Sequence, residues 1–162
     1  MRAVSIIGHK KTGKTRLIEE LIPILQARGY RVGTVKHAPH TLIQEDPNAD
    51  SARHREAGAE RTLLIGEDGA ALFFDPAEDI AETIERAFAG FDLVLIEGMK
   101  HGPFPKLEVF RPSRTLRTEP LAGEIEVIGI VTAAHVALPD GVEVLSPRDP
   151  EGIADLIEER IL

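Results

Sequence analysis

Short apolar runs alternate with amphipathic segments along the 162 residues of the chain. Residues 3–7, AVSII, predict a buried strand that ends at Gly8, and residues 30–35, YRVGTV, predict a second strand. Between them, apolar residues at helical spacing predict a helix that begins at Lys14. Strand, glycine loop, helix and strand in this order form a βαβ unit, although Pro23 predicts a kink or a break in the helix.

A polar stretch separates this unit from a short helix. Residues 36–50, KHAPHTLIQEDPNAD, contain two prolines and show no period, which predicts a long loop of the functional or mobile kind. The helix is expected over residues 51–57, with Asp50 or Ser51 as its N-cap and Gly58 as its stop.

A hairpin and a further helix are predicted next. Residues 61–74, RTLLIGEDGAALFF, contain two apolar runs joined around Asp68 and Gly69, a pattern typical of a β-hairpin. Residues 76–90, PAEDIAETIERAFAG, have apolar positions at helical spacing, and Pro76 suits the start of a helix.

The second half of the chain continues the alternation of strands and helices. Residues 91–98, FDLVLIEG, are a nearly unbroken apolar run that ends in a carboxylate, which indicates a central parallel strand buried on both faces. Asp149 can cap a last helix that has Pro150 in its first turn. Further strands are expected at residues 106–111, 125–132 and 142–145. We therefore predict one α/β domain over residues 1–162, with a mostly parallel sheet, helices on both faces and a β-hairpin.

The net charge of -8 is unevenly distributed. Residues 1–40 contain eight Lys or Arg and two Glu, a local charge of +6, so the remainder carries -14. A basic end on an acidic protein suits a compact anionic ligand better than a nucleic acid or a membrane surface. Cysteine is absent, which excludes disulfides and thiolate metal sites. No signal-peptide pattern and no run of about 18 apolar residues is found, so we expect a cytoplasmic protein.

Residues 8–15, GHKKTGKT, match the phosphate-binding P-loop pattern GxxxxGK[ST]. In such a loop, backbone N–H groups at the start of the next helix point at the phosphates. Lys14 adds a positive charge, and the Thr15 hydroxyl is placed to bind Mg²⁺. Lys10 and Lys11 either make a second phosphate contact or are simply exposed. The full set of loop positions is Gly8, His9, Lys10, Lys11, Thr12, Gly13, Lys14 and Thr15. With this loop, the predicted mostly parallel sheet is P-loop NTPase-like.

A P-loop also needs a carboxylate on the metal side, at the end of a neighbouring strand. Glu97 is the best candidate, either through a metal-bound water or as the group that orients an attacking water; otherwise it caps the next turn. Asp50 is the second candidate, because the loop before it has the position of a switch segment, although it could equally be a helix N-cap. Lys36 and His37 follow the second strand, so we expect them at the same edge of the sheet, where they could touch phosphate or substrate.

Four segments, in this order, resemble the molybdopterin-guanine dinucleotide biosynthesis protein B family, MobB. They are VSIIGHKKTGKTRLIEELIPIL, GTVKHAPH, DSARHREAGAERTLL and DLVLIEGMKHGPFPKLEVFR, and they cover most of the chain. The P-loop alone fits many families. The patterns VKH, DSxRxxxAGA and LIEGxKxxxxxKLExxR are much more specific.

The resemblance implies a GTP-binding protein with weak GTPase activity that is usually a homodimer. It would act with MobA, the nucleotidyltransferase that joins GMP to molybdopterin, and would meet molybdopterin or its molybdenum form. Thr15, Asp50 and Glu97 would lie near Mg²⁺, and the two carboxylates are then the catalytic candidates. The remaining motif positions would contact nucleotide, substrate, dimer or partner; they are Lys36, His37, Arg55, Lys100, Lys106, Glu108 and Arg111.

One segment departs from this family pattern. Similar chains often have an aspartate in the segment that reads VTAAH here, suited to the guanine N1 and N2 donors, but Ala133 and Ala134 stand in its place. The NKxD guanine motif of many GTPases is missing as well. The preference for guanine over adenine is therefore left open.

Two other functions stay possible on the residues alone. In a small-molecule kinase, the loop with Arg111, Arg114 and Arg117 would be a lid or an anion clamp, unless these are ordinary surface arginines, and residues 36–40 would bind the acceptor. The third possibility is a binding module that delivers molybdopterin to MobA without turnover. No water-positioning glutamine or arginine finger is evident next to the P-loop, so hydrolysis is expected to be slow and to depend on a partner.

Overall fold

The computed structural model describes residues 2–41, 46, 48–114 and 119–162, which fall into two compact units. The first unit contains residues 1–38 and 84–162, and the second contains residues 39–83. The expected single domain over the whole chain stays a prediction. Among the described residues, no helix is both long and apolar enough to cross a membrane.

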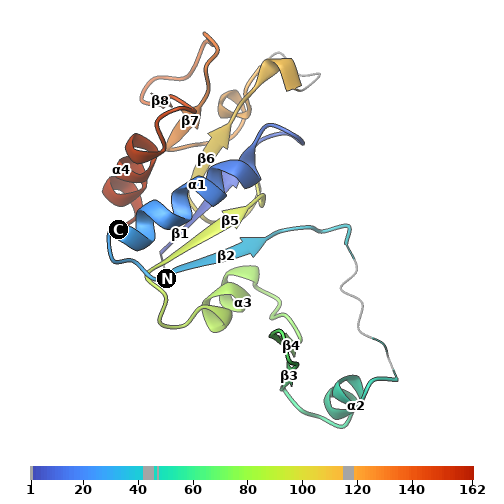
Figure 1. Ribbon diagram of the computed structural model, residues 1–162. Coiled ribbons are helices and arrows are strands. Elements are labelled where there is room, and N and C mark those ends of the chain that lie inside the picture. The colour runs from blue at the N-terminus through green and yellow to red at the C-terminus, as the bar shows by residue number, and fades with distance from the viewer. Residues whose placement is uncertain (1, 42–45, 47, 115–118) are drawn as a thin grey trace. The chain divides into compact units, whose positions relative to one another are not determined.

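A six-stranded sheet forms the first unit (Figure 1). Its strands lie in the order β2-β5-β1-β6-β7-β8, and each neighbouring pair is parallel. The strands are β1 (Ala3–Ile7), β2 (Val32–Lys36), β5 (Leu93–Glu97), β6 (Lys106–Val109), β7 (Gly129–Val131) and β8 (Glu143–Leu145). The helices are α1 (Lys14–Ala27) and α4 (Pro150–Ile161), with the 3-10 turns η1 (Pro112–Arg114) and η2 (Leu121–Gly123). The predicted parallel α/β sheet is confirmed, with strands shorter than the apolar runs that predicted them.

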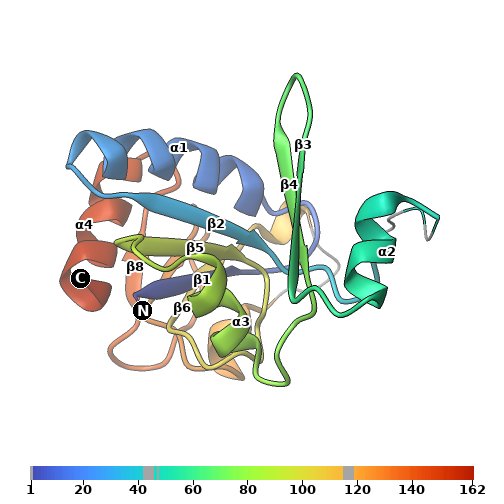
Figure 2. The same cartoon turned by 90° about the horizontal axis from the view of Figure 1, so that it is seen from below.

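Helices α1 and α4 pack side by side on one face of the sheet (Figure 2). Val4 and Leu95 of the sheet share a core with Leu21 of α1 and Ile153 of α4, and each of these four side chains is fully buried. A strand presents alternate residues to opposite faces of the sheet. Packing against α1 and α4 therefore accounts for the burial of every second apolar residue of β1 and β5.

The opposite face of the sheet has a different cover. Ile7 packs there against Leu121 and Ala122 of η2. At the β2 edge, the Phe88 ring covers Gly33 so closely that a Cβ on the glycine would lie 2.4 Å from a ring carbon. Phe88 directly follows α3 (Ile80–Ala87), so helical segments cover both faces, as predicted.

Strand β5 lies between β1 and β2, and residues 93–96 have no exposed surface. Burial on both faces is what favours an unbroken apolar run over the alternation of a half-exposed strand. The prediction of a central strand from this run is confirmed.

Helix α1 is continuous through Pro23, so the predicted break does not occur. Proline lacks the N–H that would bond the Glu19 carbonyl four residues earlier. Glu19 and Pro23 are both exposed, so water can reach that carbonyl and the helix can continue. Gly29, with a φ of +94°, ends the helix through the bond from Tyr30 N to Leu25 O, 3.1 Å long.

The second unit contains helix α2 (Asp50–Glu56), a hairpin of β3 (Arg61–Ile65) and β4 (Ala70–Phe74), and the start of α3. The two strands are antiparallel, and Ile65 pairs with Ala70. The predicted hairpin and its turn around Asp68 and Gly69 are therefore confirmed.

Two predicted helix starts are wrong. The N-cap of α2 is Ala49, whereas Asp50 is already the first helical residue. Helix α3 begins at Ile80 and not near Pro76, because the Asp79 carboxylate accepts a hydrogen bond from Ala81 N at 2.8 Å and so caps the helix there.

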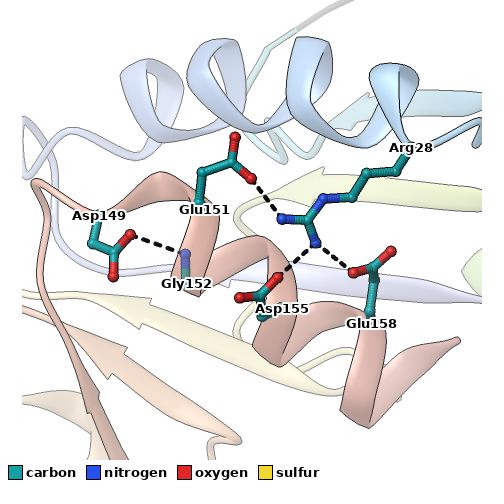
Figure 3. A network of polar contacts seen from close by, with 6 residues as sticks. All are labelled: Arg28, Asp149, Glu151, Gly152, Asp155 and Glu158. Carbon is teal, nitrogen blue, oxygen red and sulfur yellow. Dashed lines mark hydrogen bonds and ion pairs between the residues drawn. The ribbon is translucent and has the colours of Figure 1, made fainter.

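Arg28 connects the end of α1 to α4 (Figure 3). Its guanidinium pairs with the carboxylates of Glu151 at 2.6 Å, of Asp155 at 2.7 Å, and of Glu158. These hydrogen bonds raise the pKa of Arg28 above its usual value. The three acids lie on one face of α4, where without a cation they would repel one another. One arginine therefore fixes α1 against α4 and neutralises that repulsion.

Replacing Arg28 with alanine is expected to lower the free energy of unfolding by about 1 kcal/mol, because ion pairs open to solvent contribute little but here three are lost together. Urea unfolding measures the loss, which should shrink in about 1 M salt because screening weakens the remaining repulsion. Arg160→Ala is the control, since the exposed Arg160 pairs with its sequence neighbour Glu159 at 3.6 Å. Equal losses in the two variants would contradict a connecting role for Arg28.

Candidate functional site

The glycine loop between β1 and α1 has two backbone positions that favour glycine. Gly8 has a φ of +138° and Gly13 a φ of +105°. A Cβ on Gly8 would lie 2.3 Å from the Val109 carbonyl oxygen, so the loop runs against β6 with no room for a side chain. Gly13 is the N-cap of α1, whose first N–H groups therefore open into the loop.

Two side chains hold this loop in shape. Thr12 is fully buried, and its hydroxyl donates to the His9 carbonyl at 3.0 Å. The Lys14 ammonium donates to the carbonyls of Gly8 and His9 at 2.9 and 2.7 Å. Burial lowers the pKa of Lys14, and the nearby Glu97 carboxylate opposes that shift. These bonds keep the ammonium against the loop, beside the space that a P-loop offers to phosphate.

Thr15, Glu97 and Lys36 meet at the carboxyl edge of the sheet. The Thr15 hydroxyl donates to one Glu97 carboxylate oxygen at 3.0 Å, and the Lys36 ammonium pairs with the other. The strand register produces this meeting, because Glu97 lies opposite Ile6 of β1 and opposite Lys36 of β2. The Glu97 side chain is only 12% exposed, whereas that of Lys36 is 63% exposed. The carboxylate is therefore held in place from two sides.

The oxygen atoms at this edge are suitable ligands for Mg²⁺. A hydroxyl and a carboxylate are the hard oxygen ligands that Mg²⁺ prefers. Within the described residues, no three His, Cys, Asp or Glu side chains lie together to hold a metal ion by themselves. The one hydroxyl and one carboxylate that are present would suit an ion that keeps several waters.

Other predicted residues of the first unit lie in the glycine loop and in the segments that follow β2 and β5. Lys10 and Lys11 are exposed, and Lys11 has a φ of +65°. His9 has a buried Nε2 without a hydrogen-bond partner in the described structure. His37 is half-buried, and its backbone N–H donates to the last carbonyl of β5 at 3.0 Å. Lys100 is exposed in the turn that follows β5. Their contacts with nucleotide stay predictions.

Asp50 and Arg55 belong to the second unit. Asp50 is 87% exposed and pairs with Arg53 at 3.5 Å. The Arg55 guanidinium lies over the Phe73 ring, 5.3 Å from its centroid. The roles expected for Asp50 at the metal and for Arg55 at the nucleotide stay predictions, and Arg117 lies outside the described residues.

Glu108 is fully buried. The sequence motif that contains it gave no indication of this burial. Its two carboxylate oxygens accept hydrogen bonds from Leu121 N and Ala122 N, each 2.8 Å long. Burial raises the pKa of Glu108, and these two bonds and the nearby His9 lower it in part. Glu108 therefore anchors η2 to β6 beside the P-loop and offers no exposed contact in the free protein.

A cavity of about 500 Å³ adjoins the glycine loop. Arg16, Arg111 and Arg148 line it together with the turn at residues 132–134. The Arg111 guanidinium carbon lies 3.5 Å from the position of a Cβ on Gly13, so the cavity begins beside the loop. The sequence did not point to Arg16 or Arg148. Arg148 lies between β8 and α4, at the carboxyl edge of the sheet. Ligands of open α/β sheets bind at this edge, so the position of Arg148 after a predicted strand could have marked it as a candidate.

Gly8→Ala is expected to lower the free energy of unfolding by about 3 kcal/mol, because the new methyl group meets the Val109 carbonyl and the backbone is left-handed. Gly141→Ala is the matched control, since Gly141 has a φ of +83° but open space around the Cβ position. That control should lose only about 1 kcal/mol, the cost of the left-handed conformation. Chemical denaturation compares the two, and equal losses would refute the steric argument.

Comparison with known proteins gives a consistent result. The profile of the family described as molybdopterin guanine dinucleotide synthesis protein B, MobB, matches residues 3–133. The molybdopterin-guanine dinucleotide biosynthesis adapter protein of Escherichia coli (strain K12) is 36% identical over 155 residues, which is 91% of this chain and 86% of that protein. The protein of the same name from Haemophilus influenzae is 32% identical over 160 residues, 96% of this chain and 86% of that one.

A solved structure agrees with these sequence relatives. The crystal structure of Bacillus subtilis MobB superposes with a TM-score of 0.68 at 25% identity, covering 100% of this chain and 99% of that one. The likeness thus extends over both the sheet with its glycine loop and the hairpin unit. On the profile match and the two sequence relatives, this chain belongs to the MobB family.

Proposed function

We propose that this chain is a nucleotide-binding accessory protein of molybdenum cofactor biosynthesis. It binds GTP with Mg²⁺ and assists a MobA-type nucleotidyltransferase in attaching GMP to molybdopterin. The observation that carries the proposal is the meeting of the Lys14 ammonium, the Thr15 hydroxyl and the Glu97 carboxylate around one glycine loop. The relatives named as adapter proteins of molybdopterin-guanine dinucleotide biosynthesis support the pathway.

Each group at the loop has its own role in this proposal. Lys14 and the first N–H groups of α1 bind the nucleotide phosphates. Thr15 would hold Mg²⁺ directly, and Glu97 would hold it directly or through a water. Bound Mg²⁺ supplies positive charge that neutralises the phosphate oxygens. Lys36 keeps the Glu97 carboxylate at this edge in the free protein.

Hydrolysis by the chain alone is expected to be slow. The sequence has two glutamines, Gln26 and Gln44, and Gln44 lies outside the described residues. Gln26 is in the last turn of α1, about 18 Å along the helix axis from Lys14, too far to orient a water at a bound γ-phosphate. A partner that supplies a water-orienting group or an arginine would therefore raise the rate.

Two other functions, a small-molecule kinase and an adaptor without turnover, are separated from the accessory function by one experiment. The purified chain is incubated with Mg²⁺ and GTP or ATP, with and without a MobA-type nucleotidyltransferase. Phosphate release that increases with the nucleotidyltransferase supports the accessory function. Transfer of the γ-phosphate to an added small acceptor would show a kinase. A contact with the nucleotidyltransferase that needs no nucleotide and releases no phosphate would show a non-hydrolysing adaptor.

Lys14→Ala is expected to weaken the binding of Mg²⁺ and GDP at least tenfold, because a charged donor to phosphate is lost. Isothermal titration calorimetry measures the change. Arg2→Ala, which removes one charge from the same basic stretch at an exposed position, is the control and should bind as the unchanged chain does. Equal affinities in the Lys14 variant and the unchanged chain would count against phosphate binding at this loop.

The hairpin supports a homodimer as part of the proposed function. Its apolar side chains are exposed, with values of 57% for Leu63, 52% for Leu64, 73% for Ile65 and 46% for Leu72. A two-stranded hairpin alone is marginally stable in water, and exposed apolar side chains mark interaction surfaces. A second copy of the chain presents the same two strands. One twofold-symmetric contact would therefore bury the exposed apolar side chains of both hairpins at once.

Ile65→Asp is expected to raise the dimer dissociation constant at least hundredfold, because a carboxylate would have to be buried among apolar groups. Sedimentation equilibrium measures the constant. Gly69→Asp is the charge-matched control in the hairpin turn, where a Cβ meets nothing within 4 Å, and it should leave the dimer intact. If Ile65→Asp assembles as the unchanged chain does, the hairpin is not the dimer contact.

A further inference from the structure

Both oxygens of the Glu97 carboxylate are engaged in the free protein. The Thr15 hydroxyl donates to Oε2 at 3.0 Å, and the Lys36 ammonium pairs with Oε1. The first bond is compatible with Mg²⁺, because the hydroxyl gives its proton to the carboxylate and keeps its oxygen lone pairs for a metal ion. The second is not, because a metal ion beside Oε1 would meet the ammonium, a like charge. Lys36 therefore has to leave Glu97 when Mg²⁺ binds there.

The side chain of Lys36 can move, whereas that of Glu97 is confined. Lys36 is the last residue of β2, an edge strand of the six-stranded sheet, and its side chain is 63% exposed against 12% for Glu97. The backbone of Lys36 is fixed, because it pairs with Glu97 in the parallel register and the next N–H, that of His37, donates to the Glu97 carbonyl at 3.0 Å. The ammonium can therefore swing on its flexible stem while the base of the side chain stays at the site.

A second ammonium group lies close to this ion pair. Burial lowers the pKa of Lys14, the Glu97 carboxylate opposes this shift, and the Lys36 ammonium adds to it. Lys14 is held against the glycine loop by its bonds to the Gly8 and His9 carbonyls, 2.9 and 2.7 Å long. A phosphate group bound by Lys14 would therefore lie within electrostatic range of Lys36.

We propose that Lys36 takes the place of the metal ion beside Glu97 in the free protein, and moves from Glu97 to the terminal phosphate when Mg²⁺ and a nucleoside triphosphate bind. The inference rests on the proposed nucleotide binding and adds how the site distinguishes a triphosphate from a diphosphate. The step is an exchange of ion pairs, in which no covalent bond changes. Lys36 is thus a positioning residue in the free chain and a phosphate-binding residue in the complex.

The charges explain why the third phosphate decides this exchange. In a triphosphate complex, the displaced Lys36 ammonium regains an anionic partner at the γ-phosphate. A diphosphate ends one phosphate earlier, so the displaced ammonium would face Mg²⁺ and Lys14 without an anion of its own, and like charges at short range repel. Lys36 should therefore favour Mg²⁺ with a triphosphate and oppose Mg²⁺ with a diphosphate.

Calorimetric titration of the whole chain in saturating Mg²⁺ tests the proposal with GDP and with GMPPNP, a GTP analogue that resists hydrolysis. Lys36→Met should weaken GMPPNP binding by about tenfold, the effect of losing one charged donor to phosphate, and should not weaken GDP binding. Lys36→Arg keeps the positive charge and should retain most of the GMPPNP affinity. Arg2→Met is the control, because it removes a positive charge from an exposed position before β1, and it should change neither affinity.

A second titration isolates the displacement of Lys36 from Glu97. Mg²⁺ is titrated into the chain saturated with GDP, where no γ-phosphate is present. Lys36→Met should bind this Mg²⁺ about threefold more tightly than the unchanged chain, because no ion pair competes for the carboxylate. Circular dichroism checks that the variant is folded, as expected for a change at an exposed side chain. If it is unstable, Lys36→Gln removes the same charge and takes its place.

Each contrary result overturns a defined part of the proposal. Equal weakening of GDP and GMPPNP binding by Lys36→Met would make Lys36 an ordinary phosphate contact and would refute the exchange. Unchanged GMPPNP affinity in that variant, or weaker Mg²⁺ binding in its GDP complex, would refute the exchange as well, while leaving nucleotide binding at the loop in place. Failure of the unchanged chain to bind either nucleotide would refute the proposed function itself.

Discussion

The parallel pairing of β5 with both β1 and β2 is the constraint on which the candidate site depends. Its register sets Glu97 opposite Ile6 and Lys36, so the carboxylate ends level with the first turn of α1, where Thr15 meets it. A slip of one residue would turn Glu97 to the other face of the sheet. The four preceding residues of β5 resist such a slip, because all are buried and successive side chains pack on opposite faces of the sheet.

Strand β6 gives the phosphate loop its second support. The Val109 carbonyl lies against Gly8, so the loop rests directly on this strand. One residue earlier, the buried Glu108 carboxylate holds η2, and two residues later Arg111 reaches Gly13 and the cavity. A strand of four residues thus shapes the loop and precedes one wall of the neighbouring cavity. Changes in β6 would therefore alter the proposed nucleotide binding without touching the nucleotide.

The two compact units differ in how far they bury their apolar side chains. The sheet unit buries its strands between α1 and α4 on one side and η2 and Phe88 on the other. The hairpin presents leucine and isoleucine side chains to solvent. A single short hairpin has too little surface to bury both of its faces, which is the physical reason for expecting a second chain there. In the proposed function, phosphate binding and assembly would therefore belong to different units.

The sequence by itself determined the features that depend on short-range pattern. The glycine loop, the continuous apolar run of β5, the hairpin and the Asp149 cap of α4, which accepts from Gly152 N at 3.0 Å, follow from neighbouring residues. Only the tertiary structure decided the pairing of Lys36 with Glu97, the burial of Glu108 and the gathering of three arginines around one cavity. These residues are far apart in the chain, and strand register and burial determine whether a charged side chain binds a partner, supports a turn or faces a ligand.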